Sequence, residues 1–293
     1  MKSQTTINKL KELCSSFTGD MYEQYLFGEL TFKEIQQITS SKFNELRTFF
    51  KENNIHYRTS VINDFTNHTI FDNIDSELKA YLLGFYLADG CLTEKSSIIT
   101  ISVSEKDKEI IELFRAAICI YNKISISKPY KNKTTGFVTK PMARISFRSK
   151  HLANTLTKYK MGVRKTYSEI DTLDFIPNNL MIHFIRGYFD GDGTVNCSNI
   201  ERTYKTKLGE TRISKSRNFN WSIISCKSKH LILIQKFLKD NYNISPNIIK
   251  DSKGYYLLEI NKKEDFFKFR DILYKDSEFY LKRKKDKYME IPC

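Results

Sequence analysis

Two acidic residues occupy the same position in two similar short stretches, and both could hold a metal ion. YLLGFYLADGCL, residues 81–92, contains Asp89, and FIRGYFDGDGTV, residues 184–195, contains Asp192. Carboxylate oxygens, together with water and phosphate oxygens, suit Mg²⁺, for which Mn²⁺ can substitute. Carboxylates that share two metals can activate water on one side of a phosphodiester and stabilise the leaving oxygen on the other. The two stretches therefore predict a metal-dependent hydrolytic centre.

Small residues precede both acids at a spacing of four, which predicts two helices in close contact. Gly84 and Ala88 share one helical face in the first stretch, and Gly187 and Gly191 do so in the second. Such faces can pack almost backbone to backbone. The acids would then lie side by side at the negative ends of two helix dipoles, which costs energy unless cations bind there. We expect the metal site to comprise the two acids and the residues that follow them, Gly90 and Gly193, and Gly193 to end its helix.

The order of elements after each stretch is the same, which indicates an internal repeat. A strand, a helix, a hairpin and a second helix follow the first stretch, over residues 97–159, and the same series follows the second, over residues 220–273. The linear distance from the acid to the next helix is longer in the second copy, which predicts a longer loop there. The simplest architecture is an α+β fold of two pseudo-twofold-related αββαββα repeats. We predict repeats at 75–176 and 177–293, a helical module at 1–58 and a linker at 59–74.

The N-terminal module has the pattern of two short helices separated by a tight turn. Thr31 is a suitable N-cap with Glu34 three residues later, and Ser40 or Ser41 could cap the next helix. That helix would direct Phe43, Leu46 and Phe50 inward. The pattern predicts a helix-turn-helix whose second helix presents DNA-binding candidates: Lys42, Asn44, Arg47 and Lys51. The alternative is a small helical bundle with a solvated charged face.

The charge of the chain favours a polyanionic partner. Lys and Arg number 48 against 34 Asp and Glu, a net charge of +14, which favours nucleic acid first and an anionic membrane second. The first twenty residues contain no apolar signal-peptide core, and no apolar run approaches membrane-spanning length. The six cysteines lack zinc-site spacing. We expect a protein of the cytoplasm, associated with the nucleoid, or of an organellar matrix, neither secreted nor bound to a membrane.

The two motifs LLGFYLADG and IRGYFDGDG resemble the double motif of single-chain LAGLIDADG homing endonucleases, and the resemblance extends over residues 75–290. It implies that the motif helices form the central interface and that the two sheets form a saddle along the DNA major groove. The last acid of each motif binds metal in this family, which assigns that role to Asp89 and Asp192. The sixth motif position is Leu87 in the first copy and Asp190 in the second. Because that position is not a metal ligand, Asp190 is expected to be expendable.

The resemblance also implies a lysine after the last helix of each repeat, near the scissile phosphates. MGVRKTY supplies Lys165, and YLKRKKDKY supplies Lys284. The catalytic set is therefore Asp89, Asp192, Lys165 and Lys284. The alternative for the lysines is an ordinary solvated basic segment, and in the second copy the neighbouring positions Lys282, Arg283 and Lys285 offer other registers.

Basic residues of the predicted strands and hairpins are candidates for DNA contact, and strand alternation would send about half of them to one sheet face. The first hairpin contains Lys128, Tyr130, Lys131, Lys133, Lys140, Arg144 and Arg148. The second-copy insertion contains Arg202, Lys205, Lys207, Arg212, Lys215 and Arg217.

These features predict a site-specific, Mg²⁺-dependent double-strand DNA endonuclease of the homing type, monomeric because both motifs lie on one chain. Two alternatives share the fold: a DNA-binding transcriptional regulator without cleavage activity, and a maturase that binds intron RNA during splicing. An intein is not expected, because the sequence begins at Met1 and ends in MEIPC without a His-Asn pair.

Overall fold

The computed structural model describes residues 8–12, 14–15, 17–27, 29–53, 55, 66–119, 122–131, 134, 136, 138–205, 207 and 209–292. The chain forms two compact units. One comprises residues 1–70 and 92–153, and the other comprises residues 71–91 and 154–293. The motif helix of the first predicted repeat thus belongs to the second unit, together with the motif helix of the second repeat. Among the described residues, no helix combines the length and apolar character needed to cross a membrane.

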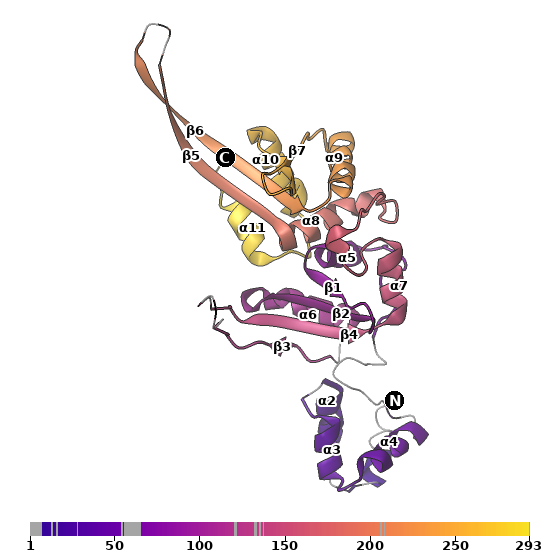
Figure 1. Ribbon diagram of the computed structural model, residues 1–293. Helices are drawn as coiled ribbons and strands as arrows, with labels where there is room; N and C mark the ends of the chain where they lie inside the picture. Colours follow the sequence, from indigo (N-terminus) through magenta and orange to yellow (C-terminus); the bar gives the residue numbers. More distant parts are fainter. Residues whose placement is uncertain are drawn as a thin grey trace. The chain divides into compact units, whose positions relative to one another are not determined.

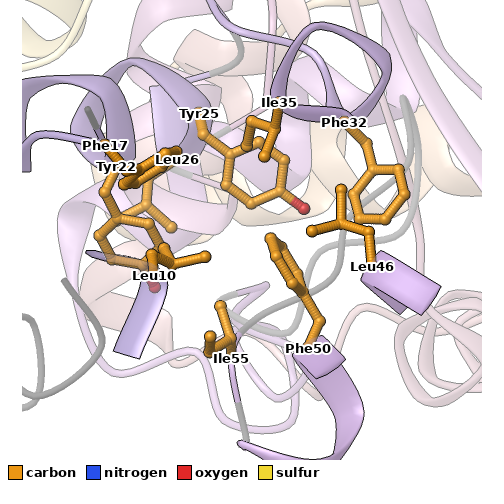
Figure 2. Packing of buried hydrophobic residues seen from close by; sticks show 10 residues of the cluster. All are labelled: Leu10, Phe17, Tyr22, Tyr25, Leu26, Phe32, Ile35, Leu46, Phe50 and Ile55. Carbon is orange, nitrogen blue, oxygen red and sulfur yellow. The ribbon is translucent and has the colours of Figure 1, made fainter. Parts of the chain in front are cut away.

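The N-terminal region contains helices α2 (Gly19–Phe27), α3 (Phe32–Ile38) and α4 (Phe43–Glu52), visible in Figure 1. Aromatic rings contact one another inside this region: the ring of Phe50 meets those of Tyr25 and Phe32 edge to face. Figure 2 shows these side chains converging on one cluster, and the region therefore has an apolar core of its own. The cluster consists of Leu10, Phe17, Tyr22, Tyr25, Leu26, Phe32, Ile35, Leu46, Phe50 and Ile55.

The N-cap of α3 is the residue predicted from the sequence, whereas the N-cap of α4 is a different residue. The backbone N–H of Glu34 donates to Thr31 Oγ1 at 3.2 Å, and the Thr31 N–H donates to Glu34 Oε2 at 2.6 Å, so the predicted capping box is confirmed. The cap of α4 is Lys42, not Ser40 or Ser41, because Glu45 accepts the Lys42 N–H at 3.1 Å. Phe43 then becomes the first helical residue; its ring meets that of buried Phe32 edge to face but is 45% exposed, so it lies at the edge of the core and not inside it.

The first sheet is antiparallel, with strand order β1-β2-β4-β3. Buried and outward-facing residues alternate along β4: Ala143, Ile145 and Phe147 are buried, and Arg144 and Arg148 are exposed. The buried face packs with the apolar side of an amphipathic helix, α6. The elements are β1 (Gly90–Leu92), β2 (Ile98–Ser104), α6 (Lys108–Ile118), β3 (Ser125–Ile126), β4 (Met142–Arg148) and α7 (Lys150–Lys158).

The second sheet has the equivalent order, β5-β6-β8-β7, and is covered on one face by helices of the second unit. Phe189 on α8 stacks on Trp221 of β6 with ring centroids 4.9 Å apart, and Phe269 of α10 meets Trp221 edge to face. This aromatic layer fixes the second motif helix on its sheet. The unit contains α5 (Glu77–Asp89), α8 (Met181–Asp192), β5 (Gly193–Lys205), β6 (Thr211–Ser225), α9 (Lys229–Tyr242), β7 (Asn247–Lys250), β8 (Tyr256–Ile260), α10 (Lys263–Tyr274) and α11 (Lys282–Met289).

The α+β prediction of two αββαββα repeats is confirmed. The first series runs α5-β1-β2-α6-β3-β4-α7, and the second runs α8-β5-β6-α9-β7-β8-α10, followed by α11. Equal strand order in the two sheets follows from this equal series of elements.

The second-copy insertion is a long hairpin, so the prediction of a longer loop is wrong. Strands β5 and β6 pair continuously from Gly193 with Ile223 to Lys205 with Thr211, whereas β8 pairs only with the last part of β6, from Trp221 to Ser225. Figure 1 shows the two strands running on as a ribbon beyond the rest of their sheet. Both faces of this ribbon are exposed. The sequence consequently lacks the apolar alternation by which a strand is usually detected.

Candidate active site

Helices α5 and α8 contact each other through their backbones at two glycines. A Cβ on Gly84 would collide with the carbonyl of Phe184 and lie 2.9 Å from the backbone nitrogen of Tyr188. A Cβ on Gly187 would collide in the same way with the carbonyl of Tyr81. One turn later, Gly191 faces the methyl group of Ala88. All four small residues of the predicted helix interface therefore lie at the contact.

The contact brings the two acids together at the C-termini of the helices. Asp89 is the last residue of α5, and Asp192 is the last residue of α8. A Cβ on Gly191 would lie 3.2 Å from Asp89 Oδ2, so the Asp89 carboxylate lies against α8 beside Asp192. Asp192 as a residue is exposed, but desolvation of its carboxyl by the surrounding protein raises the pKa of that group. The ammonium groups of Lys165 and Lys284 counter this rise.

Glycine follows each acid for a reason that the sequence did not indicate. Gly90 has φ −74° and Gly193 has φ −81°, extended conformations that any residue can adopt. A Cβ on Gly90 would collide with the ring of Tyr86, and one on Gly193 would collide with the ring of Phe189. Glycine is needed at these two helix ends because an aromatic ring from the preceding turn fills the space that a side chain would occupy.

Lys165 bonds to the end of the first motif helix. Its ammonium group donates to the carbonyl oxygens of Leu87 at 2.6 Å and Ala88 at 2.8 Å. Burial lowers the pKa of Lys165, and the carboxylates of Asp192 and Asp89 counter that shift. The ammonium group thus lies close to both acids and satisfies carbonyls that no helical N–H reaches.

Lys284 makes the equivalent contacts at the second motif helix. Its ammonium group donates to the carbonyl oxygen of Phe189 at 3.3 Å and to that of Gly193. Burial lowers its pKa to about 8, while the carboxylates of Asp190, Asp192 and Asp89 act in the opposite direction. Within the basic run, Lys282 instead pairs with Asp286, and Lys285 lies over the Tyr280 ring. The structure therefore distinguishes Lys284 from these neighbours.

The two acids and the carbonyls at the ends of their helices supply oxygen atoms. Within the part of the chain that the structure describes, no group of three or more His, Cys, Asp and Glu residues is arranged to hold a metal ion. A metal would therefore rest on Asp89 and Asp192, with the remaining ligands from water, backbone carbonyls and a bound phosphate, which fits Mg²⁺ or Mn²⁺. The Gly193 carbonyl already accepts Lys284, so it offers only its second lone pair. The two ammonium groups also supply positive charge, so the helix ends do not require a metal for neutrality.

Two buried polar residues of α8 form a network that the sequence analysis did not identify. The carboxylate of Asp190 accepts hydrogen bonds from the hydroxyls of Tyr81 and Tyr274 and from the backbone N–H of Leu281. Burial raises the pKa of Asp190 to about 6. Arg186, 1% exposed, lies one turn earlier. Asp190 therefore has a structural role, as the acceptor for three donors, that the expectation about metal binding did not consider. The available signal was two charged residues four apart in an apolar helix.

A cavity of about 190 Å³ opens beside Asp192 and Lys165. His230 also lines this cavity and is 3% exposed. Its Nε2 shares a hydrogen bond of 3.1 Å with the Tyr188 hydroxyl. Its Nδ1 is buried and has no hydrogen-bond partner among the described residues. Burial lowers the pKa of His230 to about 4, so the ring is neutral at pH 7. No sequence signal identified this histidine, which lies in an ordinary amphipathic helix.

The DNA-contact candidates of the first sheet are exposed wherever the structure describes them. Arg144 and Arg148 lie on the face of β4 opposite the core, and the Arg148 Nε donates to the Ser96 carbonyl at 2.7 Å. The other described candidates lie between β3 and β4: Lys128, Tyr130, Lys131 and Lys140. Lys133 is outside the described residues.

The candidates of the β5–β6 hairpin are also exposed, and the strand register divides them between two faces. Arg202 and Arg212 share a face with Asn196 and Asn220, the face opposite buried Val195 and Trp221. The opposite face carries Lys205, Lys215 and Arg217, and Lys207 lies in the turn.

The four candidates of the N-terminal module are exposed on or next to α4: Lys42, Asn44, Arg47 and Lys51. The surrounding module is almost neutral, because residues 8–55 contain six Lys and Arg against seven Asp and Glu. The positive charge of the chain is therefore concentrated outside this module.

Comparisons with known proteins give matches to parts of this chain. A family model for a LAGLIDADG-like domain matches residues 179–274, which include α8 and extend through α10. The DNA-directed RNA polymerase subunit Rpo1C of Methanocaldococcus jannaschii is 32% identical over 118 residues, which make up 40% of this chain and 12% of that protein. This chain thus spans only a small part of that relative.

The solved structures that match this chain share little sequence with it. The homing endonuclease I-WcaI, bound to its DNA recognition sequence, is 16% identical with a TM-score of 0.49, and the match covers 73% of this chain and 87% of that one. The N-terminal LAGLIDADG domain of DUF199/WhiA is 18% identical with a TM-score of 0.41, covering 75% and 92%. The match to the family model confirms, over residues 179–274, the resemblance predicted from the motifs.

Proposed function

We propose that this protein is a site-specific double-strand DNA endonuclease that hydrolyses phosphodiester bonds with Mg²⁺ or Mn²⁺. The observation that carries the proposal is the meeting of Asp89 and Asp192 at the ends of two helices in backbone contact. Lys165 and Lys284 bind the terminal carbonyls of the same two helices. Because each motif helix ends in one acid and is contacted by one lysine, the arrangement is suited to cutting the two strands of a duplex.

The chain's own residues would bind the metal and control charge at the reacting phosphate. Asp89 and Asp192 would hold the divalent ion, with Gly90 and Gly193 contributing through their backbones. Such an ion, when bound, lowers the pKa of coordinated water and stabilises charge on phosphate oxygens. Lys165 and Lys284 carry fixed ammonium groups beside the acids, and these favour the negative charge that develops on the phosphate in the transition state. Their bonds to helix carbonyls keep the charges in place before DNA binds.

Double-stranded DNA is the proposed substrate because exposed basic residues follow both sheets. Arg144 and Arg148 on β4, and Arg202 and Arg212 on the hairpin, lie on strand faces opposite the core. The polar uncharged side chains on the same hairpin face, Asn196 among them, are able to contact base edges. Cations of the other candidate positions would contact phosphates. The N-terminal helix-turn-helix would extend the contact through Asn44 and Arg47.

The proposal is tested by removing each acid in turn. The wild-type protein is first used to recover bound duplexes from a randomised library, and the recovered site is placed in a supercoiled plasmid. With Mg²⁺, Asp89→Asn and Asp192→Asn are each expected to reduce double-strand cleavage at least about 100-fold, roughly 2.7 kcal/mol of transition-state stabilisation. Binding of the same duplex in EDTA should persist, because neither substitution removes a cation.

The matched control is Asp240→Asn, which removes an exposed carboxylate on α9. It should cleave as the wild type does. Double-strand cleavage retained by both Asp89→Asn and Asp192→Asn would refute the assignment of the two acids.

A second function, sequence-specific DNA binding without cleavage, is favoured by one observation. Lys165 and Lys284 compensate the paired acids without any metal, so the acids also have a structural use. A wild-type protein that retains one specific duplex and cuts it in neither Mg²⁺ nor Mn²⁺ would support a regulatory role in place of the nuclease.

A further inference from the structure

We infer that Asp190 and Arg186 are positioning residues for Lys284, and that cleavage of one DNA strand depends on them while cleavage of the other does not. The inference rests on the proposed nuclease function. It concerns a difference between the two halves of the site, which the sequence repeat alone would make equivalent.

Asp190 holds the start of the helix that carries Lys284. Its Oδ2 accepts the backbone N–H of Leu281 at 2.7 Å and the Tyr81 hydroxyl at 2.9 Å, and its Oδ1 accepts the Tyr274 hydroxyl at 2.5 Å. The side chain is 1% exposed. Leu281 is the N-cap residue of α11. The carboxylate therefore fixes the entry to α11 relative to α5, α8 and α10.

Arg186 holds the connection between α10 and α11 one turn earlier. Its Nη1 donates to the Leu273 carbonyl at 2.9 Å, and its Nε donates to the Phe279 carbonyl at 2.7 Å. Its Nη2 pairs with Glu77, and the same carboxylate oxygen accepts the backbone N–H groups of Glu278 and Phe279. Both ends of the connecting segment are thus bonded to side chains of α5 and α8.

Lys284 completes a closed path of contacts that begins and ends on one turn of α8. Its backbone N–H donates to the Leu281 carbonyl at 3.0 Å, within the first turn of α11. Its ammonium group reaches the carbonyl of Phe189, the neighbour of Asp190 in the chain. A displacement of Leu281 would move the ammonium group away from the helix end and from the acids.

Among the described residues, the first half of the site shows no equivalent network. Leu83 and Leu87 occupy the motif positions equivalent to Arg186 and Asp190. A tight backbone turn positions Lys165 instead: Arg164 adopts φ +54°, and its carbonyl accepts the N–H of Tyr167 at 2.9 Å. Loss of the α8 network should therefore leave Lys165 in place.

The test uses the wild-type plasmid site with each strand labelled separately. Lys165→Met and Lys284→Met first assign one strand to each lysine. Asp190→Leu and Arg186→Leu, which introduce the first-half residues, should slow the Lys284 strand at least about tenfold, because small displacements in an active site have large kinetic effects. The Lys165 strand should change less than about twofold, so that nicked plasmid accumulates. Asp190→Asn, which keeps an acceptor for Leu281 at equal size, should restore cutting of both strands.

General destabilisation would slow cleavage of both strands together, and that result, or equal cleavage of both strands by Asp190→Leu, would overturn the inference.

A readout independent of activity separates this inference from the proposed nuclease function. Acetylation of lysines by acetic anhydride, followed by mass spectrometry, should show faster modification of Lys284 in Asp190→Leu than in wild type, with Lys165 unchanged. Unchanged Lys284 labelling refutes the positioning role even if the protein cuts DNA. Absence of cleavage by the wild type refutes the nuclease function, whatever the labelling shows.

Discussion

Glycine has several distinct roles within the two motifs. At Gly84 and Gly187 the space of a side chain is taken by backbone of the other helix, which cannot move without separating the helices. At Gly191 the same space is taken by the methyl group of Ala88. At Gly193 it is taken by an aromatic ring of the same helix. Equal letters in the two motifs therefore satisfy different packing constraints.

These differences predict graded losses of stability. Gly84→Ala or Gly187→Ala should lower the free energy of unfolding by about 3 kcal/mol, because the added methyl group meets a backbone carbonyl. Gly191→Ala should be partly rescued by Ala88→Gly, which moves one methyl group from α5 to α8. Urea denaturation followed by circular dichroism measures all four variants. Equal losses for the three single variants, without rescue, would contradict this account.

At the scale of elements, the β5–β6 hairpin is the largest difference between the two repeats. From the Asn199–Arg217 pair to the Lys205–Thr211 pair, the two strands form a ladder with no other described strand, and the β6 side chains over residues 211–218 are exposed on both faces. A ribbon of this kind contributes little core, so its residues are free to serve binding. The strand register places Arg202 and Arg212 on one face of the hairpin and Lys205 and Lys215 on the other, so the two members of each pair can contact the same partner.

A salt titration distinguishes the two faces. The double variant Arg202→Ala with Arg212→Ala should weaken DNA binding and reduce the slope of log affinity against log salt by about 0.9 for each phosphate that is no longer neutralised. The matched pair Lys205→Ala with Lys215→Ala should leave the slope close to the wild-type value. Filter binding at several salt concentrations gives both slopes. A larger change from the second pair would place the DNA on the opposite face.

At the scale of the whole chain, the net positive charge does not come from the N-terminal helical region. The net charge is +14, yet residues 8–55 contain one more acid than base. In the proposed function, long-range attraction of DNA would consequently come from the remainder of the chain. The proposed contribution of the N-terminal module is local contact through exposed residues of α4, and not bulk electrostatic affinity.

Footprinting tests this division. Arg47→Ala combined with Lys51→Ala should shorten the protected region at one end, while affinity falls by less than about tenfold, the equivalent of 1.4 kcal/mol. Lys33→Ala, an exposed position on α3, serves as the control and should leave the footprint unchanged. An unaltered footprint in the double variant would show that α4 does not contact DNA.

Much of the fold was predictable because repeats and spacings are linear properties. The series of helices and strands followed from the internal repeat, and the capping box at Thr31 followed from residue types three positions apart. The α4 cap at Lys42 and the hairpin were not predictable in the same way. Several candidate caps were adjacent in the first case, and both strand faces were polar in the second.

The sequence by itself determined the two motifs, the acids Asp89 and Asp192 that close them, and the α+β repeat, because each is encoded by residues close together in the chain or by a repeated pattern. Only the tertiary structure decided that Lys284 reaches a motif helix while Lys282 pairs with Asp286, and that Asp190 accepts three hydrogen bonds in the network beside it. The physical reason is distance along the chain. Asp190 bonds to Tyr81, 109 residues earlier, and to Leu281, 91 residues later, contacts that form only when the elements pack.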